Sequence, residues 1–235
     1  MKIITDTKTR IVEIFSSIQG EGLHIGERHI FVRFKDCNLN CCYCDEIHNS
    51  SYLLSTDHVL EKIQYLERNN GPHSYVSLTG GEPLCHIDFL EILCPKVCDK
   101  GLNIFLETNG TLYIELKKII HLISVTSMDI KLKSVWEIED CYKSHNDFLH
   151  VLEGYNFYIK MIISHNVDIE EYLKYIKLIY KFNNTIPLIL QPLTPSYGHN
   201  KINLYSILFE LQEIALQKLI NVRVIPQLHK IINLK

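Results

Sequence analysis

The stretch IFVRFKDCNLNCCYC, residues 30–44, joins an apolar run to a group of closely spaced cysteines. The run Ile30–Phe34 is almost continuously apolar, as strands buried on both faces of a parallel sheet tend to be. Cys37, Cys41 and Cys44 follow it in the spacing C-x3-C-x2-C. We therefore expect a buried strand that leads directly into a site with three thiols.

Outward from this stretch, short apolar runs alternate with longer amphipathic segments. The further runs expected to be strands are 75–78, 103–107, 123–130, 157–163, 188–191 and 222–225. The segments expected to be helices are 56–68, 87–97, 112–122, 168–182 and 204–219. This alternation is typical of an α/β fold with a parallel sheet and right-handed crossovers. About six units predict a single domain with an incomplete (β/α)6-type TIM-like barrel.

Composition restricts the classes of partner. The formal net charge of the 235 residues is −3, which gives no electrostatic reason to expect nucleic acid or an anionic membrane. No apolar stretch is long enough to suggest a membrane span. Residues 1–10 are polar and mixed in charge, unlike a signal peptide. We therefore expect a cytoplasmic protein whose eight cysteines stay reduced.

Three thiols at this spacing fit two kinds of metal site. With His48, they would make a structural Cys3His zinc site, since zinc accepts both sulfur and nitrogen. Alternatively, they would hold an iron–sulfur cluster, which normally takes four protein thiolates when it only carries electrons. Three thiolates would leave one iron open to another ligand. Cys42 lies inside the triplet and could compete as a ligand.

Polar groups follow four of the expected strands. The first is Thr79-Gly80-Gly81-Glu82-Pro83, and the others are 107–110, 127–131 and 191–195. Paired glycines let a backbone approach a ligand closely, and Glu82 can accept from an ammonium group. Carboxyl ends of parallel strands lie on one rim of the sheet, where such folds bind ligands. We therefore favour one shared ligand site over four independent turns.

Three further groups lie outside these strand ends. Residues 16–22 combine glycines with an amide and a carboxylate, which can bind the edge of a heterocycle. Arg33 interrupts the first apolar run and needs a carboxylate from the protein or from a substrate. Arg223, Gln227 and His229 form a polar group near the end of the sequence.

Cys37, Cys41 and Cys44, together with Gly80-Gly81-Glu82-Pro83, resemble the motifs of the radical S-adenosylmethionine (radical SAM) superfamily. The resemblance implies that the three cysteines bind a [4Fe–4S] cluster and that Cys42 is a spacer. It also implies that the amine and carboxylate of S-adenosylmethionine chelate the fourth iron, with the glycine segment holding the amine.

Within that superfamily, residues 13–22, 31–34 and 223–230 resemble the 7-carboxy-7-deazaguanine synthase family. The likeness extends from about residue 13 to 230 and is weakest from 136 to 153. It implies a radical SAM lyase that contracts the ring of 6-carboxy-5,6,7,8-tetrahydropterin to 7-carboxy-7-deazaguanine and releases ammonia. This reaction belongs to the biosynthesis of 7-deazapurines such as queuosine. The resemblance also implies one domain over 1–235, with a substrate-binding extension over about 1–29.

The family resemblance assigns residues to three groups. The residues implied to bind the pterin substrate are Ile18, Gln19, Gly20, Glu21, Arg33, Thr79 and His229. The residues implied to contact S-adenosylmethionine are Tyr43, Cys44, Asp45, Gly81, Glu82, Ser127, Asp129, Lys131 and Gln191. The family usually places a threonine or serine ligand to Mg²⁺ where this chain has Glu46, a carboxylate that Mg²⁺ also accepts.

The family also implies partners, namely an external electron donor such as flavodoxin or ferredoxin and a second copy in a homodimer. Two other functions are open. A radical activating enzyme would share the cluster and the glycine segment, but would act on a glycine of a partner protein. The zinc-stabilised binding module described above would not be an enzyme.

Overall fold

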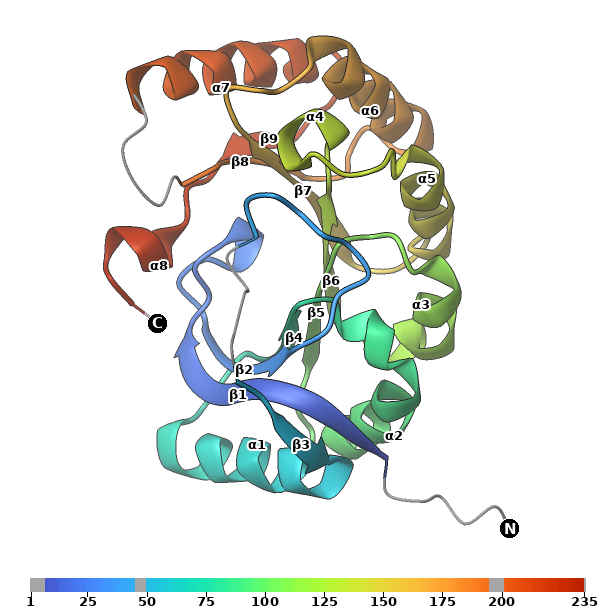
Figure 1. Ribbon diagram of the computed structural model, residues 1–235, viewed down its shortest axis with the longest axis vertical. Helices are drawn as coiled ribbons and strands as arrows, with labels where there is room; N and C mark the ends of the chain where they lie inside the picture. Colours follow the sequence, from blue (N-terminus) through green and yellow to red (C-terminus); the bar gives the residue numbers. More distant parts are fainter. Residues whose placement is uncertain (1–6, 45–49, 195–200, 235) are drawn as a thin grey trace.

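In the computed structural model, which describes residues 7–44, 50–194 and 201–234, the chain forms one nine-stranded sheet with helices around its outside (Figure 1). The strand order is β3-β1-β2-β4-β5-β6-β7-β8-β9. The strands are β1 (Lys8–Ile18), β2 (Arg28–Phe34), β3 (Tyr52–Ser55), β4 (Tyr75–Gly80), β5 (Ile104–Thr108), β6 (Val125–Ile130), β7 (Phe157–Ile163), β8 (Leu188–Pro192) and β9 (Val222–Val224). The sheet curves but does not close, so the expected incomplete barrel is confirmed.

The sheet is mostly, not wholly, parallel. Strands β2 and β4 to β9 run parallel, whereas β1 pairs antiparallel with both β2 and β3. The sequence-based assignment of strands omitted β1 and β3. β1 begins with the charged residues Lys8 and Arg10, and most of it is only half-buried, so it lacks a continuous apolar run. The first residues of the polar group at 16–22 are therefore the end of β1.

Within the described ranges, eight α-helices connect and flank the strands. They are α1 (Thr56–Asn70), α2 (Ile87–Cys98), α3 (Tyr113–Ile119), α4 (Lys133–Trp136), α5 (Tyr142–Val151), α6 (Ile169–Phe182), α7 (Lys201–Leu216) and α8 (Leu228–Ile231). Short 3-10 helices lie at Gly22–His24 (η1), Pro83–His86 (η2) and Ile120–Leu122 (η3). All five expected helices are present, but α4, α5 and α8 were not expected. Asp168 caps α6 by accepting from the backbone N–H groups of Glu170 and Glu171.

Two apolar layers hold the fold together. The larger one fills the space between the sheet and the outer helices. The smaller one lies inside the barrel and is built around Phe105, Val125, Tyr158 and Ile189. His24, His29 and Tyr75 contact the Phe105 ring, with centroids 5.2 to 5.7 Å apart. We call His24, His29, Tyr75, Phe105 and Tyr158 the aromatic floor.

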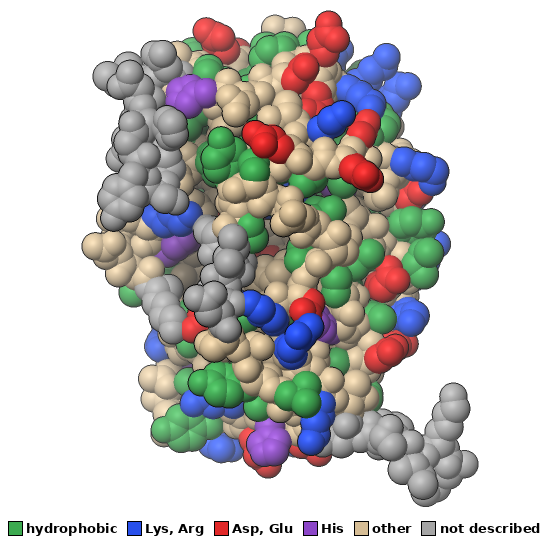
Figure 2. Space-filling model, viewed as in Figure 1, with side chains coloured by type: hydrophobic (Ala, Val, Ile, Leu, Met, Phe, Trp, Pro, Cys, Tyr) green, Lys and Arg blue, Asp and Glu red, His purple; other side chains and the backbone are tan. Residues whose placement is uncertain are grey.

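The surface carries both signs of charge. On the face shown in Figure 2, Lys and Arg side chains are interspersed with Asp and Glu. Among the helices of the described residues, none combines the length and apolar character that a membrane span requires.

Candidate active site

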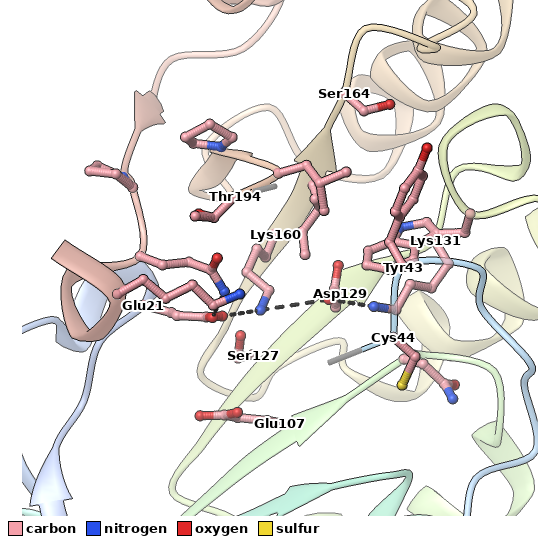
Figure 3. A pocket seen from close by; sticks show the side chains of 18 of the residues that line it. Glu21, Tyr43, Cys44, Glu107, Ser127, Asp129, Lys131, Lys160, Ser164 and Thr194 are labelled. Carbon is pink, nitrogen blue, oxygen red and sulfur yellow. Dashed lines mark hydrogen bonds and ion pairs between the residues drawn. The ribbon is translucent and has the colours of Figure 1, made fainter. Parts of the chain in front are cut away.

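Above the aromatic floor, the barrel interior opens into a cavity of about 900 Å³. Side chains from the carboxyl ends of β4 to β8 line it, together with the cysteine loop and the segment after β9 (Figure 3). Of the predicted site residues, those on its wall are Glu21, Tyr43, Cys44, Thr79, Gly81, Ser127, Asp129 and Lys131. The strand-end motifs thus meet on one rim.

The cysteine loop enters the cavity directly after β2. Burial raises the pKa of Cys37, and it raises the pKa of Cys41 to about 11, so these thiols keep their protons until a metal binds. Cys37 Sγ accepts from the Leu39 N–H at 3.4 Å. Asn109 Nδ2 lies 3.9 Å from the same sulfur and 2.9 Å from Asn38 Oδ1. The end of β5 therefore supports the loop.

Cys42, the fourth cysteine of the loop, is hydrogen-bonded to α4. Its Sγ–H donates to Val135 O at 3.7 Å, and its N–H donates to Trp136 O at 3.2 Å. Among the described residues, no three His, Cys, Asp or Glu side chains converge on a single-ion site. A cluster does not need such convergence, because it spaces its thiolates farther apart than one tetrahedral ion does.

The paired glycines allow close contact with the cysteine loop. Gly80 has a φ of +109°, and a Cβ at that position would lie 2.3 Å from Phe34 O. A Cβ on Gly81 would lie 2.2 Å from Asp36 O. The Glu82 N–H donates to the same Asp36 oxygen at 2.7 Å. The glycines thus let the chain after β4 lie against the backbone that leads to Cys37.

Glu82 does not line the cavity. It is fully buried and accepts from Leu84 N at 3.1 Å, Thr108 Oγ1 at 2.9 Å and Asn109 N at 2.7 Å. Burial raises its pKa to about 7, although these hydrogen bonds oppose the rise. Its carboxylate thus fixes the end of β5 beneath the cavity wall.

A row of alternating charges crosses the cavity (Figure 3). Lys160 of β7 forms ion pairs with Glu21 and, at 3.6 Å, with Asp129, which also pairs with Lys131 at 2.9 Å. Burial alone would raise the pKa of Glu21, but Lys160 and the Gln227 amide lower it to about 2. Burial alone would lower the pKa of Lys160, but the surrounding carboxylates raise it well above its usual value. Glu21 and Lys160 therefore stay ionised at neutral pH.

Glu107, a half-buried residue of β5, is a second anchor on the wall. Its Oε1 accepts from Gln19 Nε2 and its Oε2 from Thr79 Oγ1, both at 2.7 Å. Two residues that the family resemblance assigns to the substrate therefore meet on one carboxylate. Gln19 is almost fully buried, and its Oε1 accepts from the Glu21 N–H at 3.0 Å.

The segment after β9 closes one side of the site. The Leu228 N–H donates to Gly20 O at 2.8 Å, and Gln227 Nε2 donates to Glu21 Oε1 at 2.7 Å. A Cβ on Gly20 would lie 2.2 Å from His229 Nδ1, so the imidazole lies directly against this glycine. The predicted residues Gly20, Glu21 and His229 are thus brought together, although His229 and Gly20 do not line the cavity.

Arg33 has a partner within the protein. Its Nε lies 3.1 Å from Glu13 Oε1 on β1, and its guanidinium lies 5.6 Å from the Phe15 ring centroid. It occupies the position on β2 opposite Thr79 on β4. Arg33 and Ile18, the last residue of β1, do not line the cavity.

Several buried polar atoms around the cavity have no partner among the described residues. They are both amide atoms of Gln191, Asp129 Oδ1 and Trp136 Nε1. Gln191 lies opposite Ile162, which lines the cavity, so its amide faces the barrel interior. Unpaired buried donors and acceptors are costly unless a ligand satisfies them. Together with the three thiols, these atoms fit a bound polar cofactor.

Some predictions are untested and some residues were missed. Asp45, Glu46 and His48 lie outside the described residues. Lys160 was missed because it lies inside an apolar run, although a lysine in a doubly covered strand must find a carboxylate. Glu107 was noted only as part of a strand-end motif. Its position after an apolar strand was the available signal.

Comparisons with known proteins identify the family. A model of the radical SAM superfamily matches residues 31–193. The chain is 34% identical over 238 residues to the 7-carboxy-7-deazaguanine synthase of Geobacter sulfurreducens, with 93% of this chain and 94% of that protein covered. It is 34% identical over 244 residues to the same enzyme of Methanocaldococcus jannaschii, with 94% and 98% covered.

Solved structures share the fold. The crystal structure of QueE from Escherichia coli superimposes with a TM-score of 0.61 at 19% identity, covering 94% of this chain and 95% of that one. Archaeal TYW1 gives a TM-score of 0.54 at 15% identity, covering 81% and 72%. The chain therefore belongs to the radical SAM superfamily and, within it, to the 7-carboxy-7-deazaguanine synthase family.

Proposed function

We propose that this enzyme contracts the ring of 6-carboxy-5,6,7,8-tetrahydropterin to 7-carboxy-7-deazaguanine and releases ammonia, in 7-deazapurine biosynthesis such as that of queuosine. The observation that carries the proposal is the juxtaposition of three thiols with a largely buried row of charges at one end of the barrel. A glycyl-radical activating enzyme would instead have to admit a loop of another protein.

A [4Fe–4S] cluster on Cys37, Cys41 and Cys44 supplies, with S-adenosylmethionine, the radical that abstracts hydrogen when both are bound. The residues proposed to hold that cofactor are Tyr43, Cys44, Asp45, Gly81, Glu82, Ser127, Asp129, Lys131 and Gln191. Lys131 would attract its carboxylate, whereas Gln191 offers an amide that has no partner in the described part of the chain. For Glu82 we propose an indirect role, because its carboxylate is engaged by Thr108 and Asn109.

The substrate would occupy the side of the cavity nearer to α8. The aminopyrimidinone edge of a pterin offers N–H donors, and the ionised Glu21 carboxylate and the side-chain oxygens of Glu107 are acceptors on that side. Ile18, Gln19, Gly20, Thr79 and His229 would complete this subsite. Arg33 would bind the substrate carboxylate, which would replace part of the contact that the guanidinium makes with Glu13.

Four further features belong to the proposal. Mg²⁺ would bind at Glu46, because a carboxylate is a hard oxygen donor. Flavodoxin or ferredoxin would reduce the cluster. The enzyme would act in the cytoplasm as a homodimer.

An anaerobic turnover experiment tests the function. The reconstituted, reduced enzyme is mixed with S-adenosylmethionine and the carboxypterin, and products are identified by mass spectrometry. We expect 7-carboxy-7-deazaguanine and ammonia in equal amounts, without any second protein substrate. Cleavage of S-adenosylmethionine with no change in the pterin would overturn the proposed substrate.

A further inference from the structure

Helix α4 is held at both of its ends. At its start, the Glu171 carboxylate of α6 accepts from the backbone N–H groups of Lys133 at 2.6 Å and Ser134 at 2.9 Å. At its end, the carbonyls of Val135 and Trp136 have no partner within the helix and accept from Cys42. The helix therefore ties the cysteine loop to α6.

The indole of Trp136 lies between this helix and the cavity. Its side chain is only 4% exposed and forms part of the cavity wall. Lys131 Nζ lies 4.0 Å from the centroid of the indole ring and 2.9 Å from Asp129 Oδ2. The ammonium is thus held between an aromatic face and a carboxylate, in an environment with little water.

We propose that Trp136 is a positioning residue of the cofactor site, which holds the Lys131 ammonium where it can attract the carboxylate of the cofactor. The inference rests on the proposed role of Lys131 in cofactor binding. A tryptophan face attracts a cation more strongly than phenylalanine or an aliphatic side chain does. Without it, the flexible lysine stem would leave Asp129 as the only fixed group that orients the ammonium.

The contact between Trp136 and Lys131 can be tested without the cofactor. Trp136 is the only tryptophan in the chain, so the intrinsic emission reports on this one site. We expect Lys131→Met to shift or change the intensity of that emission in the cluster-loaded enzyme before S-adenosylmethionine is added, because a cation close to the indole is removed. The matched control is Lys133→Met, an exposed lysine at the start of the same helix, which should leave the emission unchanged. Equal emission in the wild type and Lys131→Met would overturn the contact.

The role of the contact is tested with S-adenosylhomocysteine, which binds but is not cleaved, on reconstituted protein with equal iron content. We expect Trp136→Leu to weaken binding about 5- to 20-fold, and Trp136→Phe to recover most of it. In the double variant with Lys131→Met, the Trp136→Leu change should add nothing further. Trp136→Met replaces Trp136→Leu if the latter does not fold.

The outcomes separate the inference from the function on which it rests. Weaker binding in Lys131→Met with wild-type affinity in Trp136→Leu overturns the inference alone. Additive effects in the double variant also overturn it, because Trp136 would then act independently of Lys131. Wild-type affinity in Lys131→Met overturns the proposed role of Lys131, and the inference with it, while catalytic turnover still tests the function.

Discussion

The two ends of the barrel interior differ sharply although the same strands build both. On β7, Tyr158 belongs to the aromatic floor, while Lys160, two residues later, forms two ion pairs. On β5, Phe105 likewise belongs to the floor, and Glu107, two residues later, accepts a hydrogen bond from Thr79 at the polar end. Side chains that point into the barrel are two residues apart along a strand. On each of these strands, one such side chain therefore packs in the aromatic floor and the next belongs to the polar site.

The difference indicates that the aromatic end stabilises the fold, whereas the polar end provides the binding site. The floor buries aromatic surface, which favours folding. The polar end buries charges whose desolvation offsets much of their attraction. It also leaves Gln191 and Asp129 atoms that no other described residue satisfies. The molecule therefore tolerates a costly layer because a well-packed one lies beneath it.

The largest expected effect comes from removing Cys41, a proposed cluster ligand on the loop after β2. Cys41→Ala should reconstitute with little iron and sulfide and lose essentially all turnover, because two thiolates hold a cluster poorly. Cys42→Ala is the matched control, since its thiol donates to Val135 O. It should keep its iron and at least a large part of its turnover. Loss of the cluster from both variants alike would contradict the division between ligands and spacer.

Within the polar end, Lys160→Met should reduce turnover by about 100-fold or more and cost about 3–5 kcal/mol of unfolding free energy. It leaves Glu21 and Asp129 buried without their shared cation. Urea unfolding and steady-state kinetics measure the two losses. A double variant with Glu21→Gln should regain stability but not turnover. If stability does not recover, the ion pair is not the reason for the loss.

At the opposite end, Phe105→Ala should cost about 3–5 kcal/mol of unfolding free energy while the folded enzyme keeps its kcat. The ring is fully buried among the floor residues and does not line the cavity. Calorimetry and turnover below the unfolding transition measure the two quantities. A kcat reduced as strongly as in Lys160→Met would show that the two ends do not divide stability from function.

A smaller effect concerns His145, whose Nε2–H donates to Asn109 O, so that Nδ1 of the neutral ring accepts from the Tyr175 hydroxyl. Burial lowers its pKa to about 4, although the bond with Asn109 opposes this. Between pH 6.5 and 4, the unfolded state therefore binds the proton and the native state does not. The contribution of His145 to the unfolding free energy is therefore fully present above pH 6.5. It falls by about 3 kcal/mol as the pH is lowered towards 4.

His145→Gln should flatten part of that pH dependence in urea unfolding experiments. The pH dependence that remains in this variant should come from His29 of the floor, because burial also lowers the pKa of His29 to about 4. An unchanged slope in His145→Gln would mean that His145 carries a proton in the native state.

Much of the fold was predictable because buried parallel strands have continuous apolar runs. Several of the runs that became β2 and β4 to β9 come close to this, and the helices between them have regular apolar faces. β1 was missed because it is half-buried and begins with charged residues. α4 is too short for any helical period to show.

The site was predictable only in part. The cysteines and glycines have fixed spacing, so they were visible in the sequence. The pairing of Lys160 with Glu21 depends on contacts between residues 139 positions apart, which no local pattern contains. The assignment of Gln19 and Thr79 to the substrate side did not reveal that both donate to Glu107.

The contacts of Gly80 and Gly81 limit which substitutions these two positions can accept. The atoms that a side chain at either position would strike belong largely to the main chain of Phe34 and Asp36. No smaller neighbour can relieve such a collision, because every amino acid has the same backbone. A search for second-site suppressors of Gly81→Ala should therefore recover reversions or altered loop lengths, and not compensating changes in side-chain size.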